Sequence, residues 1–177
     1  MNINMLIVII LGTIGIIYYS WWVSLKDKRY HGIYRFFSFE SIFILILLNI
    51  TYWFKNPLSI FQIISWIFLF SSIIIALYGF YLLKNLDKPE NKMENTTRLI
   101  NSGLYKYIRH PLYLSLILLG FGALLKNIDY ITVILTIINI FALICTAKVE
   151  EKEMINQLGN EYNEYINKTK MFIPYIF

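Results

Sequence analysis

Two polar clusters stand out in a chain that is otherwise dominated by apolar residues. The first, from Gly103 to Tyr113, joins a basic stretch to the start of an apolar run. The second, from Glu150 to Glu153, lies where the next apolar run ends. Because the two helices of a hairpin return to the same end, these clusters should meet there. Their meeting favours a small-molecule site at a membrane surface over a simple membrane anchor.

The Arg109-His110-Pro111 sequence is suited to binding an anion. Pro111 fits the first turn of a helix, where its missing N–H costs nothing. Arg109 and His110 then lie beside a helix N-terminus, whose free N–H groups and dipole attract negative charge. The planar guanidinium matches a carboxylate or a phosphate. The alternative is a basic membrane flank that binds the headgroups of membrane lipids.

Tyrosines and glutamates surround this basic pair. Tyr105, Tyr107 and Tyr113 offer flat faces that stack on adenine-like rings and attract sulfonium or ammonium cations. An interfacial tyrosine belt is the alternative. Glu150 and Glu151 are about 100° apart on a helix, so one faces inward while the other meets solvent. Because acidic residues at a helix C-terminus oppose the dipole, this pair should have a functional reason.

The composition predicts an all-α, polytopic membrane protein. Of the 177 residues, 58% are hydrophobic and 15% are charged, against about a quarter charged in soluble domains. We expect one integral membrane domain, with three spans in residues 1–83 and a loop, a hairpin and a tail in residues 84–177. The basic residues flank apolar runs, which makes them topology determinants rather than a nucleic-acid surface. The lone Cys145 excludes a disulfide within the chain.

Five apolar runs predict five transmembrane helices. They cover residues 1–25, 36–54, 56–83, 111–125 and 130–147, and residues 3–23 are expected to be a retained helix. The last two form a hairpin, which is re-entrant if the short fourth run does not cross. Asn139 should bond to a neighbouring helix. Glu40 should reach lipid headgroups, or act functionally if it lies deeper.

Orientation follows from the basic residues. Fourteen of the sixteen Lys and Arg residues fall on one side of these spans. The positive-inside rule then places the N-terminus outside, and the C-terminus with both polar clusters in the cytoplasm. After Glu153 the spacing predicts a cytosolic amphipathic helix with a break at Gly159. No metal-ligand spacing is found in the sequence.

An ordered set of motifs resembles the isoprenylcysteine carboxyl methyltransferases and the related phospholipid methyltransferases. The set covers residues 84–177 and continues beyond the hairpin to a Tyr-x-x-Tyr pair and an aromatic-apolar-Pro end. Its members are Gly103, Tyr105, Arg109-His110-Pro111, Tyr113, Glu150-Glu151, Tyr162, Tyr165 and Phe172-Ile173-Pro174.

The resemblance implies a membrane enzyme that binds S-adenosylmethionine at the cytosolic face without a Rossmann domain. Arg109 would orient an anionic substrate. Where a catalytic base is needed, Glu150 is the first candidate and Glu151 the alternative. Many family members have Arg where this chain has Met171, so Lys170, with Lys168 as the alternative, is expected to bind substrate. The implied cofactor contacts are Leu104, Tyr105, Tyr107, His110, Pro111, Tyr113, Glu150, Glu151 and Met154.

The function expected from this resemblance is methyl transfer to a lipidic or prenylated acceptor that enters from the bilayer. The first choice of acceptor is a carboxylate such as that of isoprenylcysteine. Alternatives are a phospholipid or another small lipidic amine, hydroxyl or thiol. Two other classes stay open, an NADPH-dependent reductase of the sterol-reductase type, which shares an Arg-His-Pro signature, and a non-enzymatic membrane scaffold.

Overall fold

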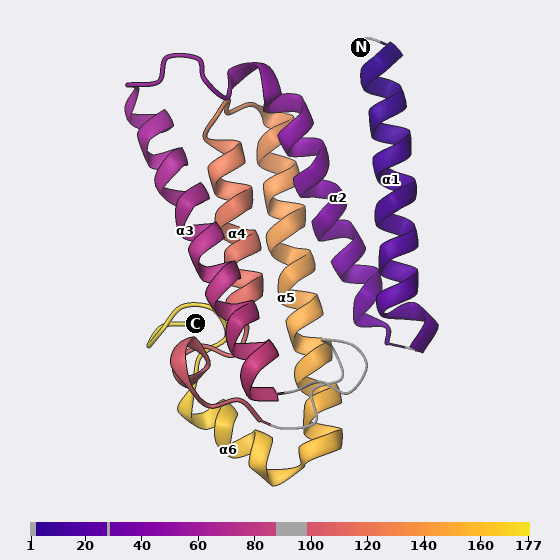
Figure 1. Ribbon diagram of the computed structural model, residues 1–177, viewed down its shortest axis with the longest axis vertical. Coiled ribbons are helices and arrows are strands. Elements are labelled where there is room, and N and C mark those ends of the chain that lie inside the picture. Colours follow the sequence, from indigo (N-terminus) through magenta and orange to yellow (C-terminus); the bar gives the residue numbers. More distant parts are fainter. Residues whose placement is uncertain (1–2, 28, 88–98) are drawn as a thin grey trace.

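The computed structural model describes residues 3–27, 29–87 and 99–177, and these residues form helices joined by loops (Figure 1). No β-strand occurs in this part of the chain, so the all-α prediction is confirmed. The α-helices are α1 (Ile3–Val23), α2 (His31–Asn49), α3 (Ile60–Leu82), α4 (Pro111–Leu124), α5 (Tyr130–Leu158) and α6 (Asn160–Lys168).

Four helical segments of the described chain are long and apolar enough to cross a membrane, as expected of a polytopic membrane protein. They are Ile3–Val23, His31–Tyr52, Ile60–Asn85 and Tyr130–Leu158. Helix α4 has 14 residues. It therefore rises about 21 Å, which is less than the roughly 30 Å of a hydrocarbon core. It lies between α3 and α5 (Figure 1), and a fifth span stays a prediction.

Small residues allow the central helices to approach closely. A Cβ atom added at Gly122 of α4 would lie 2.8 Å from Leu69 Cγ on α3. The carbonyl of Gly122 also contributes to this contact, because it accepts a 2.6 Å hydrogen bond from Ser65 Oγ of α3. In a membrane, burial of apolar side chains between helices gives little net attraction. Helices are joined there by close packing at small residues and by hydrogen bonds of side chains such as Ser.

Polar side chains in the apolar runs join neighbouring helices. Asn139 of α5 accepts a hydrogen bond from Ser38 Oγ at 2.7 Å and donates one to Leu116 O at 3.3 Å. The expectation for Asn139 is therefore confirmed. Glu40 of α2 accepts a 2.6 Å hydrogen bond from Thr13 Oγ1 of α1, a contact between these helices that the sequence alone does not indicate.

The start of α2 and the end of α5 differ from the prediction. Helix α2 begins at His31 rather than at residue 36, so His31 and Arg35 lie on the helix instead of in a loop. Helix α5 continues through the acidic run to Leu158. Glu150 and Glu151 are thus not at a helix C-terminus, and the dipole argument for them is wrong. The predicted break at Gly159 is confirmed, with φ +59°.

The end of the bundle away from α6 is held together by buried polar contacts. Asn49 Nδ2 donates to Ala123 O at 2.7 Å, and Lys126 Nζ donates to Gln62 Oε1 at 2.9 Å. The same ammonium lies 3.8 Å from the centroid of the Trp66 ring. Burial lowers the pKa of Lys126 because desolvation disfavours its charged form.

Candidate active site

A cavity of about 380 Å³ lies at the α6 end of the bundle. This volume is within the roughly 300–1,000 Å³ typical of small-molecule sites. Its wall includes residues of all six helices and of the segment that leads into α4. Seven of the residues expected to bind ligand line it, namely Tyr105, Arg109, His110, Pro111, Tyr113, Glu150 and Met154.

Gly103 begins the turn that carries several of these residues. It has a φ of +55°, a conformation that L side chains rarely adopt. An added Cβ would also lie 2.8 Å from Tyr78 Oη and from Leu82 Cδ1. Gly103 therefore allows the segment to pass close to α3 before Pro111 starts α4 at its first position.

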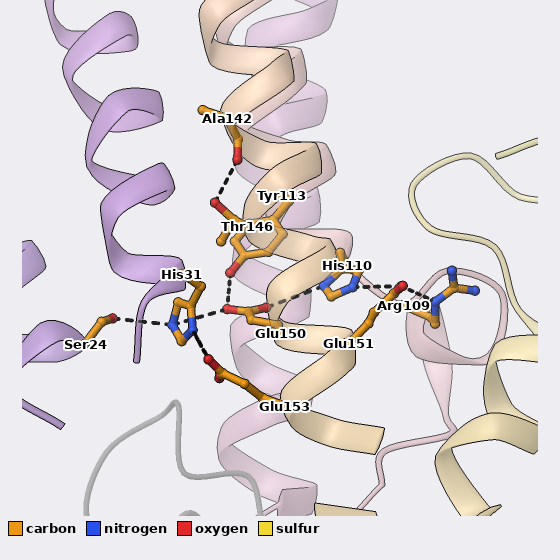
Figure 2. A network of polar contacts seen from close by, with 10 residues as sticks. All are labelled: Ser24, His31, Arg109, His110, Tyr113, Ala142, Thr146, Glu150, Glu151 and Glu153. Atoms are coloured by element: carbon orange, nitrogen blue, oxygen red, sulfur yellow. Dashed lines mark hydrogen bonds and ion pairs between the residues drawn. The ribbon is translucent and has the colours of Figure 1, made fainter. Parts of the chain in front are cut away.

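Glu150 lies at the centre of a polar network that joins three elements (Figure 2). The Tyr113 hydroxyl donates a hydrogen bond to it from α4. His110 Nδ1 lies 3.6 Å from one carboxylate oxygen, and His31 Nε2 lies 3.7 Å from the other. The His110 and Tyr113 rings stack, with centroids 5.4 Å apart and planes 12° from parallel. The site thus combines a flat aromatic surface with an adjacent carboxylate.

Arg109 pairs with Glu151 beside this network. Its Nε donates to Glu151 Oε1 at 2.5 Å, and its Nη1 donates to Thr169 O at 2.7 Å. His110 Nε2 lies 3.2 Å from the same Glu151 oxygen. Arg109 is 9% exposed and Glu151 13%. An ion pair this buried is costly to break from one side, because the remaining charge loses its partner.

The C-terminal segment is attached to the same residues through the backbone. Arg109 N donates to Lys170 O at 2.8 Å, and His110 N donates to Met171 O at 3.1 Å. The side chain of Met171 is buried with Phe172 against Tyr113 in an apolar cluster. At the position where the family resemblance leads us to expect Arg, the chain therefore has a core residue that holds the tail against α4.

His31 is a site residue that was not predicted. Its side chain is only 1% exposed and lies between two glutamates of α5. Nδ1 is 3.2 Å from Glu153 Oε2, and Nε2 is 3.4 Å from Ser24 Oγ. The sequence pattern that could have indicated His31 is its i,i+4 spacing from Arg35, which places both residues on one helix face. The pattern is recognised only if α2 is predicted to begin at His31.

Two tyrosines of α6 form another wall of the cavity. Tyr162 and Tyr165 are both buried, and burial raises the pKa of both hydroxyls well above the usual value of a tyrosine. They therefore stay protonated at physiological pH. Tyr165 Oη donates a 2.6 Å hydrogen bond to Tyr105 O, which fixes the Gly103 turn onto α6.

Four of the predicted ligand contacts do not line the cavity. Leu104 packs beside Leu82 and Ile100, and Glu151 faces Arg109 and His110. Tyr107 is 45% exposed. The Lys170 side chain is exposed. Their ligand roles stay predictions. Among the described residues, no group of three or more His, Cys, Asp or Glu side chains is arranged to hold a metal ion.

These features define an integral membrane protein with a cavity lined by apolar and polar side chains at one end of a helical bundle. Comparison with known families specifies its class. The model of the isoprenylcysteine carboxyl methyltransferase (ICMT) family matches residues 66–156, just over half of the chain. The chain therefore belongs to this family. The matched region extends from α3 almost to the end of α5.

Individual relatives carry methyltransferase names. Methanethiol S-methyltransferase 1 of Bradyrhizobium diazoefficiens is 29% identical over 116 residues, which cover 63% of this chain and 39% of that protein. Protein-S-isoprenylcysteine O-methyltransferase of Saccharomyces cerevisiae is 31% identical over 88 residues, or 49% of this chain and 37% of the relative. Methanethiol S-methyltransferase of Crocosphaera subtropica is 24% identical over 172 residues, or 89% and 66%.

The chain thus spans about two fifths of the length of the first two relatives and just under two thirds of the third. No solved structure matches it.

Proposed function

We propose that the protein is a methyltransferase that binds S-adenosylmethionine at the cytosolic end of its bundle and methylates a lipidic acceptor. The observation that carries the proposal is one cavity in which the His110–Tyr113 stack adjoins the Glu150 carboxylate. Family membership and the names of the relatives support the same reaction class.

The cavity residues fit such a cofactor chemically. S-adenosylmethionine, when bound, supplies a methyl group on a positively charged sulfonium. The stacked His110 and Tyr113 rings offer a flat face to an adenine. Glu150 and Glu153 offer acceptors to ribose hydroxyls or to an ammonium group. Tyr105 and Tyr162 add aromatic surface that attracts a sulfonium.

The remaining task of the protein is to align the acceptor and exclude water. Phe39, Phe80 and Leu116 give the cavity apolar surfaces on three helices, and these suit an acceptor with a hydrocarbon part. Arg109 is bound by Glu151, which favours a positioning role toward His110 and the tail. Direct contact between Arg109 and an anionic substrate stays a prediction.

Two classes of acceptor are favoured by particular observations. A carboxylate such as that of isoprenylcysteine agrees with the family and with the yeast relative. A thiol agrees with the two relatives named methanethiol S-methyltransferases. A carboxylate acceptor is already ionised and needs orientation only, whereas a thiol must lose a proton near neutral pH.

Calorimetry with S-adenosylhomocysteine, the demethylated product of the cofactor, tests the proposal. Purified wild-type protein should bind it. His110→Ala and Glu150→Ala should each weaken binding at least tenfold, or about 1.4 kcal/mol, because each removes part of the cavity wall. Glu161→Ala, an exposed change on α6, should leave the affinity unchanged. Absence of binding to the wild type would refute the proposal.

A further inference from the structure

A histidine held between two carboxylates lines the cavity from a helix that carries none of the family motifs. His31 lines the same cavity as His110 and Tyr113, but it comes from α2. Figure 2 shows its ring with Ser24 on one side and Glu150 and Glu153 on the other. Binding of the cofactor by His110 and Glu150 does not require this second histidine.

The contacts of His31 suit both of its protonation states. Glu153 faces Nδ1 at 3.2 Å, which favours a proton on that nitrogen and leaves Nε2 as an acceptor. Ser24 Oγ accepts a 2.5 Å hydrogen bond from Arg35 Nη2, so its own proton is available to Nε2 at 3.4 Å. When Nε2 gains a proton, Glu150 at 3.7 Å balances the new charge.

A route to solvent leads away from the same ring. The Glu153 side chain is 31% exposed, whereas that of His31 is 1% exposed. A proton that reaches the imidazole can therefore pass through the Nδ1 contact to a carboxylate that meets water. A carboxylate that orients an imidazole and stabilises its cation is the arrangement by which enzymes activate nucleophiles.

We propose that His31 is the general base of the methyl transfer and that the acceptor is a thiol with an apolar chain. This inference rests on the methyltransferase function proposed above. The thiol S–H bond breaks and its proton moves to His31 Nε2. The sulfur electron pair forms the new S–CH₃ bond, while the bond from the methyl group to the sulfonium breaks and leaves its electrons on the departing thioether. Glu153 then passes the proton to solvent.

The charged groups around His31 agree with this role. Glu150 and Glu153 face it from α5. Arg35 of α2 contacts Ser24, and Arg29 lies in the wall between α1 and α2. Arg109 and His110 line the wall on the other side. Two carboxylates beside the ring stabilise an imidazolium, and the surrounding arginines favour a thiolate. A carboxylate acceptor has no proton to give and no need of His31.

Rates of S-adenosylhomocysteine formation between pH 6 and pH 9 test the inference, with butanethiol and dodecanethiol as thiol probes and an S-prenylated cysteine as the carboxylate probe. Wild-type protein should methylate a thiol. His31→Gln should lose about 100-fold at pH 7. The loss should shrink toward pH 9, because the variant depends on thiolate already present in solution. Glu153→Gln should show a smaller loss of rate that also shrinks toward pH 9. If His31→Gln does not fold, the result for Glu153→Gln tests the inference in its place.

Calorimetry separates this inference from the proposed function. His31→Gln should bind S-adenosylhomocysteine within about twofold of wild type, because the aromatic stack is intact. Glu164→Gln, an exposed carboxylate change on α6, should match wild type in every assay. An unchanged rate and pH profile in His31→Gln, or methylation of the carboxylate probe without either thiol, would overturn the inference while leaving cofactor binding in place. Wild-type protein that binds no S-adenosylhomocysteine would overturn both.

Discussion

Glu150 is the residue that joins the parts of the site. Its oxygens are faced by Tyr113 from α4, by His110 from the segment before α4 and by His31 from α2. A carboxylate with these partners holds two imidazoles near one cavity. Arg109 and Glu151 play a different part, because their ion pair also holds the chain end through Thr169.

Arg109→Ala should lower the free energy of unfolding by about 3 kcal/mol, since the buried Glu151 carboxylate loses its guanidinium partner and keeps only His110 beside it. It should also expose residues after Thr169 to limited proteolysis. Thermal unfolding in detergent and protease digestion measure the two effects. Lys168→Ala removes only an exposed i,i+4 ion pair with Glu164 and should cost about 0.3 kcal/mol. Equal losses in the two variants would contradict the assigned role of Arg109.

At the scale of helices, close packing between α3 and α4 rests on Gly122. Gly122→Ala should destabilise the protein by about 1–3 kcal/mol, because the new Cβ would lie 2.8 Å from Leu69 Cγ and 3.2 Å from Leu69 N. Gly15→Ala is the matched control, since nothing lies within 4 Å of its added Cβ. That change should be neutral or slightly stabilising. Melting temperatures of both variants in one detergent provide the measurement.

Hydropathy predicts helices well where the sequence is uniformly apolar. The range predicted for the first helix, 3–23, is the observed one, and the turn before Tyr130 is also found. The prediction is wrong where a helix continues into polar residues, as in the first turns of α2 and the last turns of α5. Several of those polar residues, such as His31, Arg35 and Glu150, line the cavity. A search for apolar runs excludes them.

The sequence predicted only those residues of the candidate site that lie within short local motifs. Arg109, His110, Tyr113 and Glu150 lie within short motifs and do come together around one cavity. His31 is 122 residues from Glu153 in the chain, and no local pattern connects them. Lys170 was predicted to bind substrate because it precedes the tail motif in the sequence, but its side chain is exposed and does not line the cavity.

For the whole molecule, the two ends of the bundle differ in structure and should face different compartments. The α6 end (Figure 1) contains the cavity described above. At the other end, hydrogen bonds of the buried Lys126, Gln62 and Asn49 side chains join the helices. Single cysteines at Lys55 and Lys168 in a Cys145→Ser background test the orientation. A membrane-impermeant maleimide should label Lys55→Cys in intact cells, and Lys168→Cys only after lysis. The reverse pattern would place the cavity outside the cell.

The family match begins at residue 66, whereas His31 and Arg35 belong to α2 and face the cavity from outside that region. The two walls of one site therefore lie in separate blocks of sequence. Under the proposals above, His110, Tyr113 and Glu150 of the family block would face the methyl donor, whereas His31 of α2 would face the acceptor. If these roles hold, exchange of the first two helices is expected to change acceptor preference more than donor affinity. The molecule is accordingly a natural starting point for chimeras with altered specificity.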